Sequence, residues 1–202
     1  MKTTGKVTSI ISNLVAVHVD GPVAQNEICM IECGGTKLMS EVIKIVGDKA
    51  YTQVFESTRG MKVGSHVEFQ GHMLELTLGP GLLSRNFDGL QNDLEQMDGV
   101  FLKRGEYTQP LDTQKKWHFT PTAKEGDIVE AASWLGEVKE GWLPHRIMVP
   151  FKCKGSYTLK WLAGEGEYTV IDPIATIVDA DGNEETVTMS QKMACKSCDY
   201  SV

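Results

Sequence analysis

The stretch Leu78-Gly79-Pro80-Gly81-Leu82-Leu83 divides the sequence into two parts of different character. An extended apolar run ends here in a Gly-Pro-Gly turn, whose glycines have unusual backbone freedom and whose proline fixes its own φ. The residues before the turn alternate as β-strands do. Most of the chain after it forms a second, more acidic block that is also rich in strand patterns. We therefore interpret this turn as the joint between two parts of the protein.

A helical spacing follows the turn directly. The apolar residues that recur there at steps of three and four are Leu83, Phe87, Leu90, Leu94 and Met97. This spacing predicts a short helix of about four turns with one buried face. Its expected end is Asp98-Gly99, because glycine is common just beyond a helix end. The chain is then expected to become extended again from Val100 towards Pro110.

The composition is that of a soluble globular protein. The chain has 202 residues, of which 41% are hydrophobic and 23% charged, and its net charge of −7 arises entirely after residue 70. No basic stripe is present to neutralise phosphates, which argues against nucleic-acid binding. No apolar run approaches the roughly 20 residues that span a bilayer, and the N-terminus lacks the apolar segment of a signal peptide. The sequence therefore predicts a cytoplasmic protein without direct membrane insertion.

Residues 5–70 alternate with a period of two and are broken by glycine turns about every ten residues, which is typical of a sandwich or a small closed barrel. We favour the barrel, because closure removes exposed strand edges. The alternation places Val15, Val17 and Val19 on one face of one strand, and Cys29, Ile31 and Cys33 on one face of the next. In the strand after that, it places Met39, Ile43 and Ile45 on one face and Ser40 and Lys44 on the opposite face.

The second block, residues 111–188, contains most of the aromatic side chains and several glycine turns. Its aromatic residues are Trp117, Phe119, Trp134, Trp142, Phe151, Tyr157, Trp161 and Tyr168. We predict a second small all-β domain with its own aromatic core. The expected organisation is a barrel at 1–70, a connecting strand and helix at 71–110, the second domain at 111–188 and a tail at 189–202. The stretch from Gln191 onward shows no period and is expected to fray.

No arrangement of residues indicates a catalytic, cofactor or metal site. The odd number of cysteines indicates reduced thiols. Cys195-x-x-Cys198 offers half a zinc site, but Cys29 and Cys33 would have to supply the rest and are better explained as core residues. The five histidines (His18, His66, His72, His118 and His145) show no ligand spacing, and His145 is expected in a loop or at a strand edge. The acidic pairs Glu165/Glu167 and Glu184/Glu185 lie beside turn glycines, where solvated charge is expected.

One alternative function comes from Gly47-Asp48-Lys49-Ala50, which resembles the lysine hairpin of lipoyl-carrying domains. The segments Gly126-Asp127-Ile128-Val129 and Leu135-Gly136-Glu137-Val138 resemble another half of such a motif. The two halves stand in the wrong order, because this half should closely precede the lysine hairpin. A lipoyl/biotinyl-like carrier, or a small-ligand-binding β domain, therefore remains the alternative hypothesis.

Six segments together resemble, in order and spacing, the N-terminal part of the catalytic alpha chain of the V-type (archaeal and bacterial A/V-type) rotary ATPases. They are Gly5-Lys6-Val7, residues 78–91 with the Gly-Pro-Gly turn, Phe101-Leu102-Lys103-Arg104-Gly105, Gly126-Asp127-Ile128-Val129, His145-Arg146-Ile147-Met148-Val149-Pro150 and Gly166-Glu167-Tyr168-Thr169-Val170. The resemblance covers roughly residues 1–192, and the ending after Met193 does not match.

The resemblance implies a six-stranded barrel in residues 1–70, which in that family helps to ring a hexamer of alternating alpha and beta chains. It implies that the Gly-Pro-Gly stretch leads towards a nucleotide-binding domain. It also implies that the second block is the inserted "bulge", a small β-sandwich implicated in contacts with the peripheral stalk. The expected partners are therefore the V-type beta chain and the peripheral stalk, within a cytoplasmic complex, peripheral to the membrane, that couples ATP to ion or proton transport.

One departure from the family bears on activity. The phosphate-binding loop Gly-x-x-x-x-Gly-Lys-[Ser/Thr] is absent from this sequence, and its one Gly-Lys pair, Gly5-Lys6, lies on a predicted strand. Without that loop, no set of backbone amides would hold the phosphates and no lysine or hydroxyl would organise Mg²⁺. We expect a truncated, non-catalytic front part of the alpha chain that does not hydrolyse ATP alone.

Overall fold

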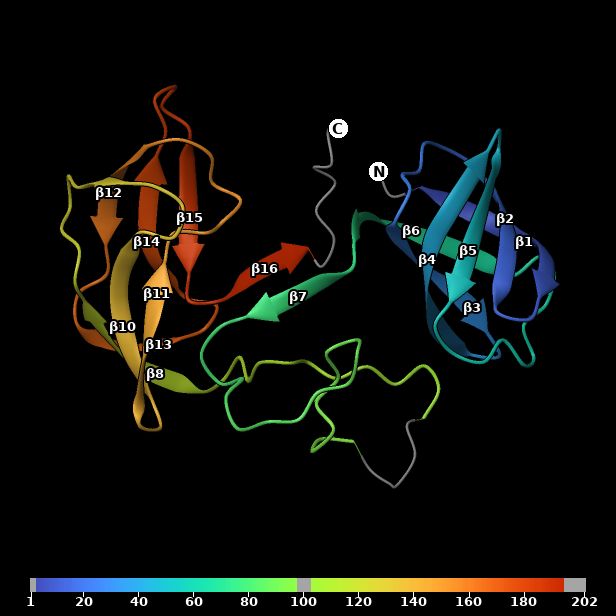
Figure 1. Cartoon of the computed structure of the whole chain (residues 1–202), viewed down its shortest axis with the longest axis horizontal. Helices are drawn as coiled ribbons and strands as arrows, with labels where there is room; N and C mark the ends of the chain where they lie inside the picture. Colours follow the sequence, from blue (N-terminus) through green and yellow to red (C-terminus); the bar gives the residue numbers. More distant parts are fainter. Residues whose placement is uncertain (1–2, 98–102, 195–202) are drawn as a thin grey trace. The chain divides into compact units, whose positions relative to one another are not determined.

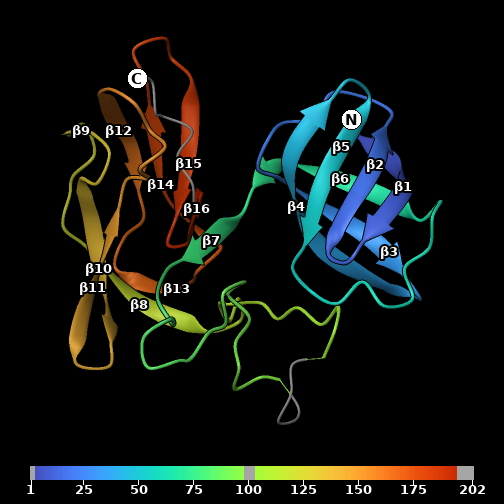
Figure 2. The ribbon, with the colours of Figure 1, turned by 45° about the vertical axis from the view of Figure 1, so that its right-hand side comes forward.

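A computed structural model describes residues 3–97 and 103–194, which form two compact units. Among these residues, the first unit contains 3–75, 97, 103–107 and 194, and the second contains 76–96 and 108–193. Figures 1 and 2 show that the regular structure in both units consists of strands. We call the units the barrel unit and the sandwich unit, for the architectures described below.

The barrel unit is built from six antiparallel strands. They are β1 (Thr4–Ile11), β2 (Leu14–Val19), β3 (Glu27–Cys33), β4 (Thr36–Val46), β5 (Lys49–Val54) and β6 (His66–Met73). The strands close in the order β1-β2-β5-β4-β3-β6, so the predicted closed six-stranded barrel is confirmed. Glu106 and Tyr107, which follow the Gly105 turn, also belong to this unit: the Tyr107 hydroxyl accepts a hydrogen bond from the Met39 amide at 2.8 Å.

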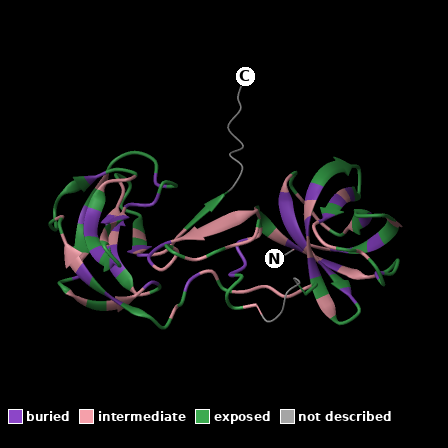
Figure 3. Ribbon diagram, turned by 60° about the horizontal axis from the view of Figure 1, so that its bottom comes forward, coloured by how far each residue is buried: buried purple, intermediate pink, exposed green. Residues whose placement is uncertain are grey.

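Alternation explains the barrel core, with one exception in β4. Figure 3 shows buried segments along the barrel strands. On the predicted faces, β2 buries Val15 and Val17 with Val19 partly buried, and β3 buries Cys29, Ile31 and Cys33. In β4, however, Ile43 and Ile45 are 38% and 37% exposed, whereas Ser40 is fully buried. The predicted face of β4 is therefore wrong. Ser40 can point inward because its hydroxyl lies 2.9 Å from the Cys29 thiol and donates to the Cys29 carbonyl at 3.1 Å.

The sandwich unit contains two four-stranded sheets. The first has the order β11-β10-β8-β13, with β8 (Lys116–Pro121), β10 (Trp134–Glu140), β11 (Leu143–Met148) and β13 (Gly166–Thr169). The second has the order β15-β14-β12-β9, with β9 (Ile128–Val129), β12 (Tyr157–Leu162), β14 (Pro173–Val178) and β15 (Glu184–Thr188). The predicted mainly-β fold, a barrel plus a small sandwich, is confirmed.

The core of the sandwich is less aromatic than its composition predicts. Trp117 and Phe119 are buried, and Phe119 meets Tyr168 edge to face at 6.2 Å between ring centroids. The rest of the core is mainly aliphatic. Trp134 and Trp142 are 55% and 85% exposed, and the Trp134 ring lies 3.6 Å from the Arg146 guanidinium carbon. The exposed aromatic side chains therefore form part of the surface.

The predicted connecting segment, residues 71–110, and the predicted tail differ most from the structure. β7 (Glu75–Leu78) pairs with β16 (Gln191–Ala194), so the expected fraying is wrong for these four residues. No helix forms among residues 83–97, and Leu83 and Leu94 are 48% and 40% exposed. Side-chain hydrogen bonds to the backbone fold this segment as consecutive turns, and Ser84 and Gln91 have φ of 63°. The predicted helix end at Asp98-Gly99, and the extended restart at Val100–Leu102, lie outside the described residues.

Within residues 3–97 and 103–194, no helix has the length and apolar character needed to cross a bilayer.

Candidate functional site

The Gly-Pro-Gly turn belongs to the sandwich unit, and its geometry requires both glycines. Gly81 has φ of 109°, a conformation that favours glycine. At Gly79, a side-chain carbon would lie 3.1 Å from both Leu111 Cδ1 and the Met189 carbonyl oxygen. The turn is thus held by close backbone packing within its own unit.

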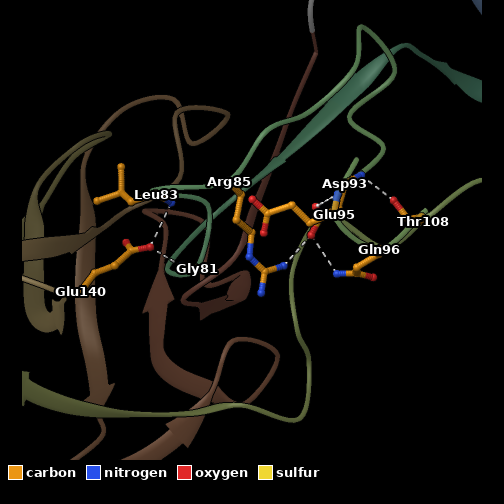
Figure 4. A network of polar contacts seen from close by, with 8 residues as sticks. All are labelled: Gly81, Leu83, Arg85, Asp93, Glu95, Gln96, Thr108 and Glu140. Atoms are coloured by element: carbon orange, nitrogen blue, oxygen red, sulfur yellow. Dashed lines mark hydrogen bonds and ion pairs between the residues drawn. The ribbon is translucent and has the colours of Figure 1, made fainter. Parts of the chain in front are cut away.

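A buried carboxylate fastens this turn to the first sheet of the sandwich (Figure 4). Glu140, only 7% exposed at the end of β10, accepts hydrogen bonds through Oε1 from the amides of Gly81 at 2.6 Å and Leu83 at 3.2 Å. Its other oxygen lies 2.7 Å from Nδ1 of His145, on the edge strand β11. Donors therefore occupy both oxygens, which is what a buried carboxylate requires.

A second buried carboxylate organises the segment after the turn (Figure 4). Asp93 is 1% exposed and pairs with Arg85 Nη1 at 2.8 Å. It also accepts from the Glu95 amide at 3.0 Å and from the Gln96 side chain at 2.9 Å, and its own amide donates to the Thr108 hydroxyl at 2.6 Å. Through its carboxylate and its amide, Asp93 thereby connects three parts of an irregular segment.

Between residues 77 and 92, two further side chains form hydrogen bonds with backbone groups, as neighbouring backbone would in regular secondary structure. The Asp88 carboxylate accepts from the amides of Leu90 at 2.9 Å and Asn92 at 2.7 Å. The Gln91 side-chain amide accepts from the Thr77 amide and donates to the Thr77 carbonyl, both at 2.7 Å. Gln91 thus pairs with β7 as a neighbouring strand would.

Replacing Gln91 with alanine is expected to open β7 locally. The substitution leaves the Thr77 amide and carbonyl without these partners, which costs about 1–3 kcal/mol. Native-state hydrogen exchange should show the Thr77 amide exchanging roughly tenfold faster or more. Gln114→Ala, a change at an exposed glutamine of the same unit, should leave the exchange rate of Thr77 unaltered. Unchanged Thr77 protection in Gln91→Ala would contradict this role.

The cysteines behave as core residues where the structure describes them. Cys29, Cys33 and Cys153 are buried and free, as predicted for Cys29 and Cys33. Burial raises the pKa of the Cys29 thiol to about 12, so it is not a thiolate at neutral pH. Cys195 and Cys198 lie outside the described residues. In the part of the chain that is described, no three or more His, Cys, Asp or Glu side chains are grouped so that they could hold a metal ion.

Of the five histidines, His118 differs from the others because both of its ring nitrogens contact carboxylates. Its two ring nitrogens each lie 3.0 Å from a carboxylate, Nδ1 from Glu167 and Nε2 from Glu165. The acidic pair predicted as solvated charge is therefore engaged with a β8 side chain, although all three groups are more than half exposed. His18, His66 and His72 make exposed contacts with Asp48, Glu68 and Glu75, and His145 lies at a strand edge as expected.

The pKa of His118 is expected to exceed its ordinary value of 6.5, first because of the hydrogen bond to Glu165 and then because of that to Glu167. Since the folded-state pKa is raised, the stabilisation is fully present below the unfolded-state pKa and is lost as the pH rises through the folded-state value. An NMR titration of the imidazole should show the raised pKa, and Glu165→Gln should lower it. Glu137→Gln, at an exposed site on β10, should not. Equal pKa values in the wild type and Glu165→Gln would contradict the assignment.

Lys49, the candidate for modification, is exposed at the start of β5, directly after the Gly47-Asp48 turn. Its neighbour Asp48 contacts His18 at 3.0 Å. Mass spectrometry of the purified chain tests the alternative hypothesis: a lipoyl or biotinyl group on this lysine would support it, and an unmodified lysine would reject it.

Comparison with known proteins identifies both units. Residues 7–71 match the model of the ATP synthase alpha/beta family β-barrel domain, and residues 108–196 match the model of the barrel-sandwich domain of ATP synthase alpha/beta subunits. The two matches together cover more than half of the chain. The chain belongs to the ATP synthase alpha/beta family. Within this family it is similar to V-type alpha chains, as the six segments predict.

The similarity to V-type alpha chains extends along nearly the whole sequence. The V-type ATP synthase alpha chain of Treponema denticola is 50% identical over 198 residues, which is 96% of this chain and 34% of that protein. That of Borrelia hermsii is 46% identical over 193 residues, covering 94% and 33%. That of Protochlamydia amoebophila is 44% identical over 199 residues, covering 97% and 34%. The chain thus spans about a third of the length of the curated relatives that it matches.

Proposed function

We propose that this chain is a non-catalytic N-terminal portion of the catalytic alpha chain of a V-type rotary ATPase/ATP synthase, serving assembly of the complex. The observation that carries the proposal is the similarity to V-type alpha chains over 96% of the chain, with both units matched to family domains. In this proposal the barrel joins neighbouring alpha and beta chains of the hexamer, and the sandwich contacts the peripheral stalk. The complex would lie on the cytoplasmic face of the membrane and transport ions or protons.

The sequence supports a docking role better than a catalytic one. It contains no Gly-x-x-x-x-Gly-Lys-[Ser/Thr] segment, and the buried carboxylates Glu140 and Asp93 are fully occupied by donors of the chain itself. We therefore propose that the chain alone does not hydrolyse ATP. We also propose that the domain boundaries are those expected from the sequence: the barrel at 1–70, the connecting segment at 71–110, the second domain at 111–188 and the tail at 189–202.

An exposed apolar hairpin offers a test of the barrel's role. Ile11 and Leu14 are cross-strand partners of β1 and β2 and are 69% and 37% exposed. Exposed apolar side chains that lie together mark interaction surfaces more often than isolated ones do. We expect Ile11→Ser/Leu14→Ser to weaken binding of the chain to the purified V-type beta chain, measured by biolayer interferometry, by about tenfold or more.

The matched control is Ile128→Ser, which removes an isoleucine that is 77% exposed in the other unit. It should leave binding to the beta chain unchanged. If both variants bind the beta chain as tightly as the wild type, this hairpin is not the contact. If the wild-type protein does not bind the beta chain at all, the proposed role of the barrel is wrong.

A further inference from the structure

A positively charged pocket lies in the sandwich unit, between the Gly-Pro-Gly turn, the start of β8 and the β10–β11 hairpin. Its volume is about 530 Å³, within the range of small-molecule sites. The lining contains four permanent cations, Arg85, Lys115, Lys116 and Lys139, against two carboxylates. In a chain of net charge −7, such a local excess of positive charge is unexpected.

The two carboxylates of the lining do not neutralise these lysines. Glu140 uses its oxygens for two backbone amides and His145, and Glu167 lies against His118. The buried Asp93 pairs with Arg85 at 2.8 Å. The charge of the three lysines is therefore left for another partner.

Lys116 and Lys139 make no ion pair with any residue that the structure describes. Lys116 acts only as a minor cause of the lowered pKa of Asp172, which is due first to the Thr169 backbone hydrogen bond. In the register of β10 and β8, Val138 pairs with Phe119, so the next pair outward is Lys139 with His118. Lys116 is two residues from His118 on the same strand face. Lys116 and Lys139 are therefore diagonal neighbours on the two paired strands. Such positions lie about 7–8 Å apart, farther than one phosphate group spans.

A buried donor without an acceptor lies in the same wall. Trp117, 7% exposed, lines the pocket, and its indole Nε1 is buried without a hydrogen-bond partner among the described groups. Such a donor costs about 1–3 kcal/mol. The Lys115 ammonium lies 4.2 Å from the centroid of the Trp117 ring. Because Nε1 is itself buried, the wall offers the pocket the Trp117 ring and the lysine ammonium groups, and a ligand with several acceptor oxygens would suit these lysines.

We propose that this pocket binds a small anion that carries two or more linked phosphate groups. A chain of linked phosphates has the length to contact Lys116 and Lys139 together, and lysine is a common phosphate ligand. The exposed Trp142 forms a further wall at the hairpin tip. This site lies in the sandwich unit, and its existence does not depend on the proposed role in assembly.

Isothermal titration calorimetry of the whole protein with tripolyphosphate and with pyrophosphate tests the proposal directly. At about 0.1 M salt we expect one equivalent of tripolyphosphate to bind with a Kd of about 10–100 µM, and inorganic phosphate to bind far more weakly. Lys116→Ala/Lys139→Ala should weaken binding of tripolyphosphate by about tenfold or more. Both lysines are exposed, so the variant is expected to fold.

The matched control is Lys124→Ala/Lys154→Ala, which removes the same charge from two exposed lysines of the sandwich unit outside the pocket. Its affinity should stay within about twofold of the wild type. Equal weakening in both double variants would show non-specific attraction and overturn the proposal. Absence of binding, or equally tight binding of citrate, would also overturn it.

Discussion

Replacing Glu140 with alanine is expected to destabilise the sandwich unit by about 3 kcal/mol, because it removes a buried charged acceptor. The amides of Gly81 and Leu83 and the ring of His145 would all lose their partner. The Gly-Pro-Gly turn would then be held by packing alone. Glu140→Gln, which keeps one acceptor oxygen, should cost clearly less.

Tryptophan fluorescence in a urea titration isolates this effect. All four tryptophans, Trp117, Trp134, Trp142 and Trp161, belong to the sandwich unit. Glu137→Ala, three residues away on β10 and exposed, is the matched control and should change the free energy of unfolding by less than about 0.5 kcal/mol. A loss in Glu140→Ala no larger than that in Glu137→Ala would contradict the anchoring role.

Replacing Gly136 with alanine is expected to lower the free energy of unfolding of the sandwich unit by about 3 kcal/mol, because the added methyl group has no room. A side-chain carbon at Gly136 would lie 2.4 Å from Phe119 Cε2 and Cζ and 2.7 Å from the Thr120 carbonyl oxygen. Phe119 is fully buried, and the carbonyl belongs to the paired strand β8, so neither can move cheaply. Gly136 follows a register shift in β10, a common position for strand glycine.

The same urea titration measures the effect of Gly136→Ala. Gly164→Ala is the matched control, because nothing lies within 4 Å of the added carbon there. It should be nearly neutral or slightly stabilising, since alanine restricts the unfolded chain. If Gly136→Ala is as stable as Gly164→Ala, the prediction is wrong, because Phe119 and β8 can then shift to accommodate the methyl group at little cost.

The barrel was predictable because its strands follow period-two alternation between regular glycine turns. The error in β4 had a local cause: Ser40 stands at an inward position, and hydrophobicity alone does not reveal the Cys29 groups that satisfy it. A register shift between Val42 and Lys44 then changes the alternation along the same strand. Period alone cannot locate such a shift.

The false helix has a different origin. Apolar residues at steps of three and four favour a helix only if that face can be buried, and Leu83 and Leu94 are largely exposed. Asp88, Gln91 and Asp93 instead bond to backbone groups. Residues of these types compete with helical hydrogen bonds, so their density was the signal against a helix.

Glu140 was missed because its partners at the turn lie 57 and 59 residues away in sequence. One signal was available. Glu140 stands two residues after the buried Val138 on an alternating strand, which assigns it to the inward face. A carboxylate at an inward position requires donors.

We propose that this protein docks onto other components of a V-type complex and does not hydrolyse ATP by itself. Sedimentation velocity of the protein with the purified V-type beta chain and, separately, with the peripheral-stalk proteins tests it most directly, with ATP hydrolysis followed in samples of the protein alone. We predict a faster-sedimenting species in each mixture and no ATP hydrolysis by the protein alone. A protein that sediments as a free monomer in both mixtures, or that hydrolyses ATP alone, would contradict the claim.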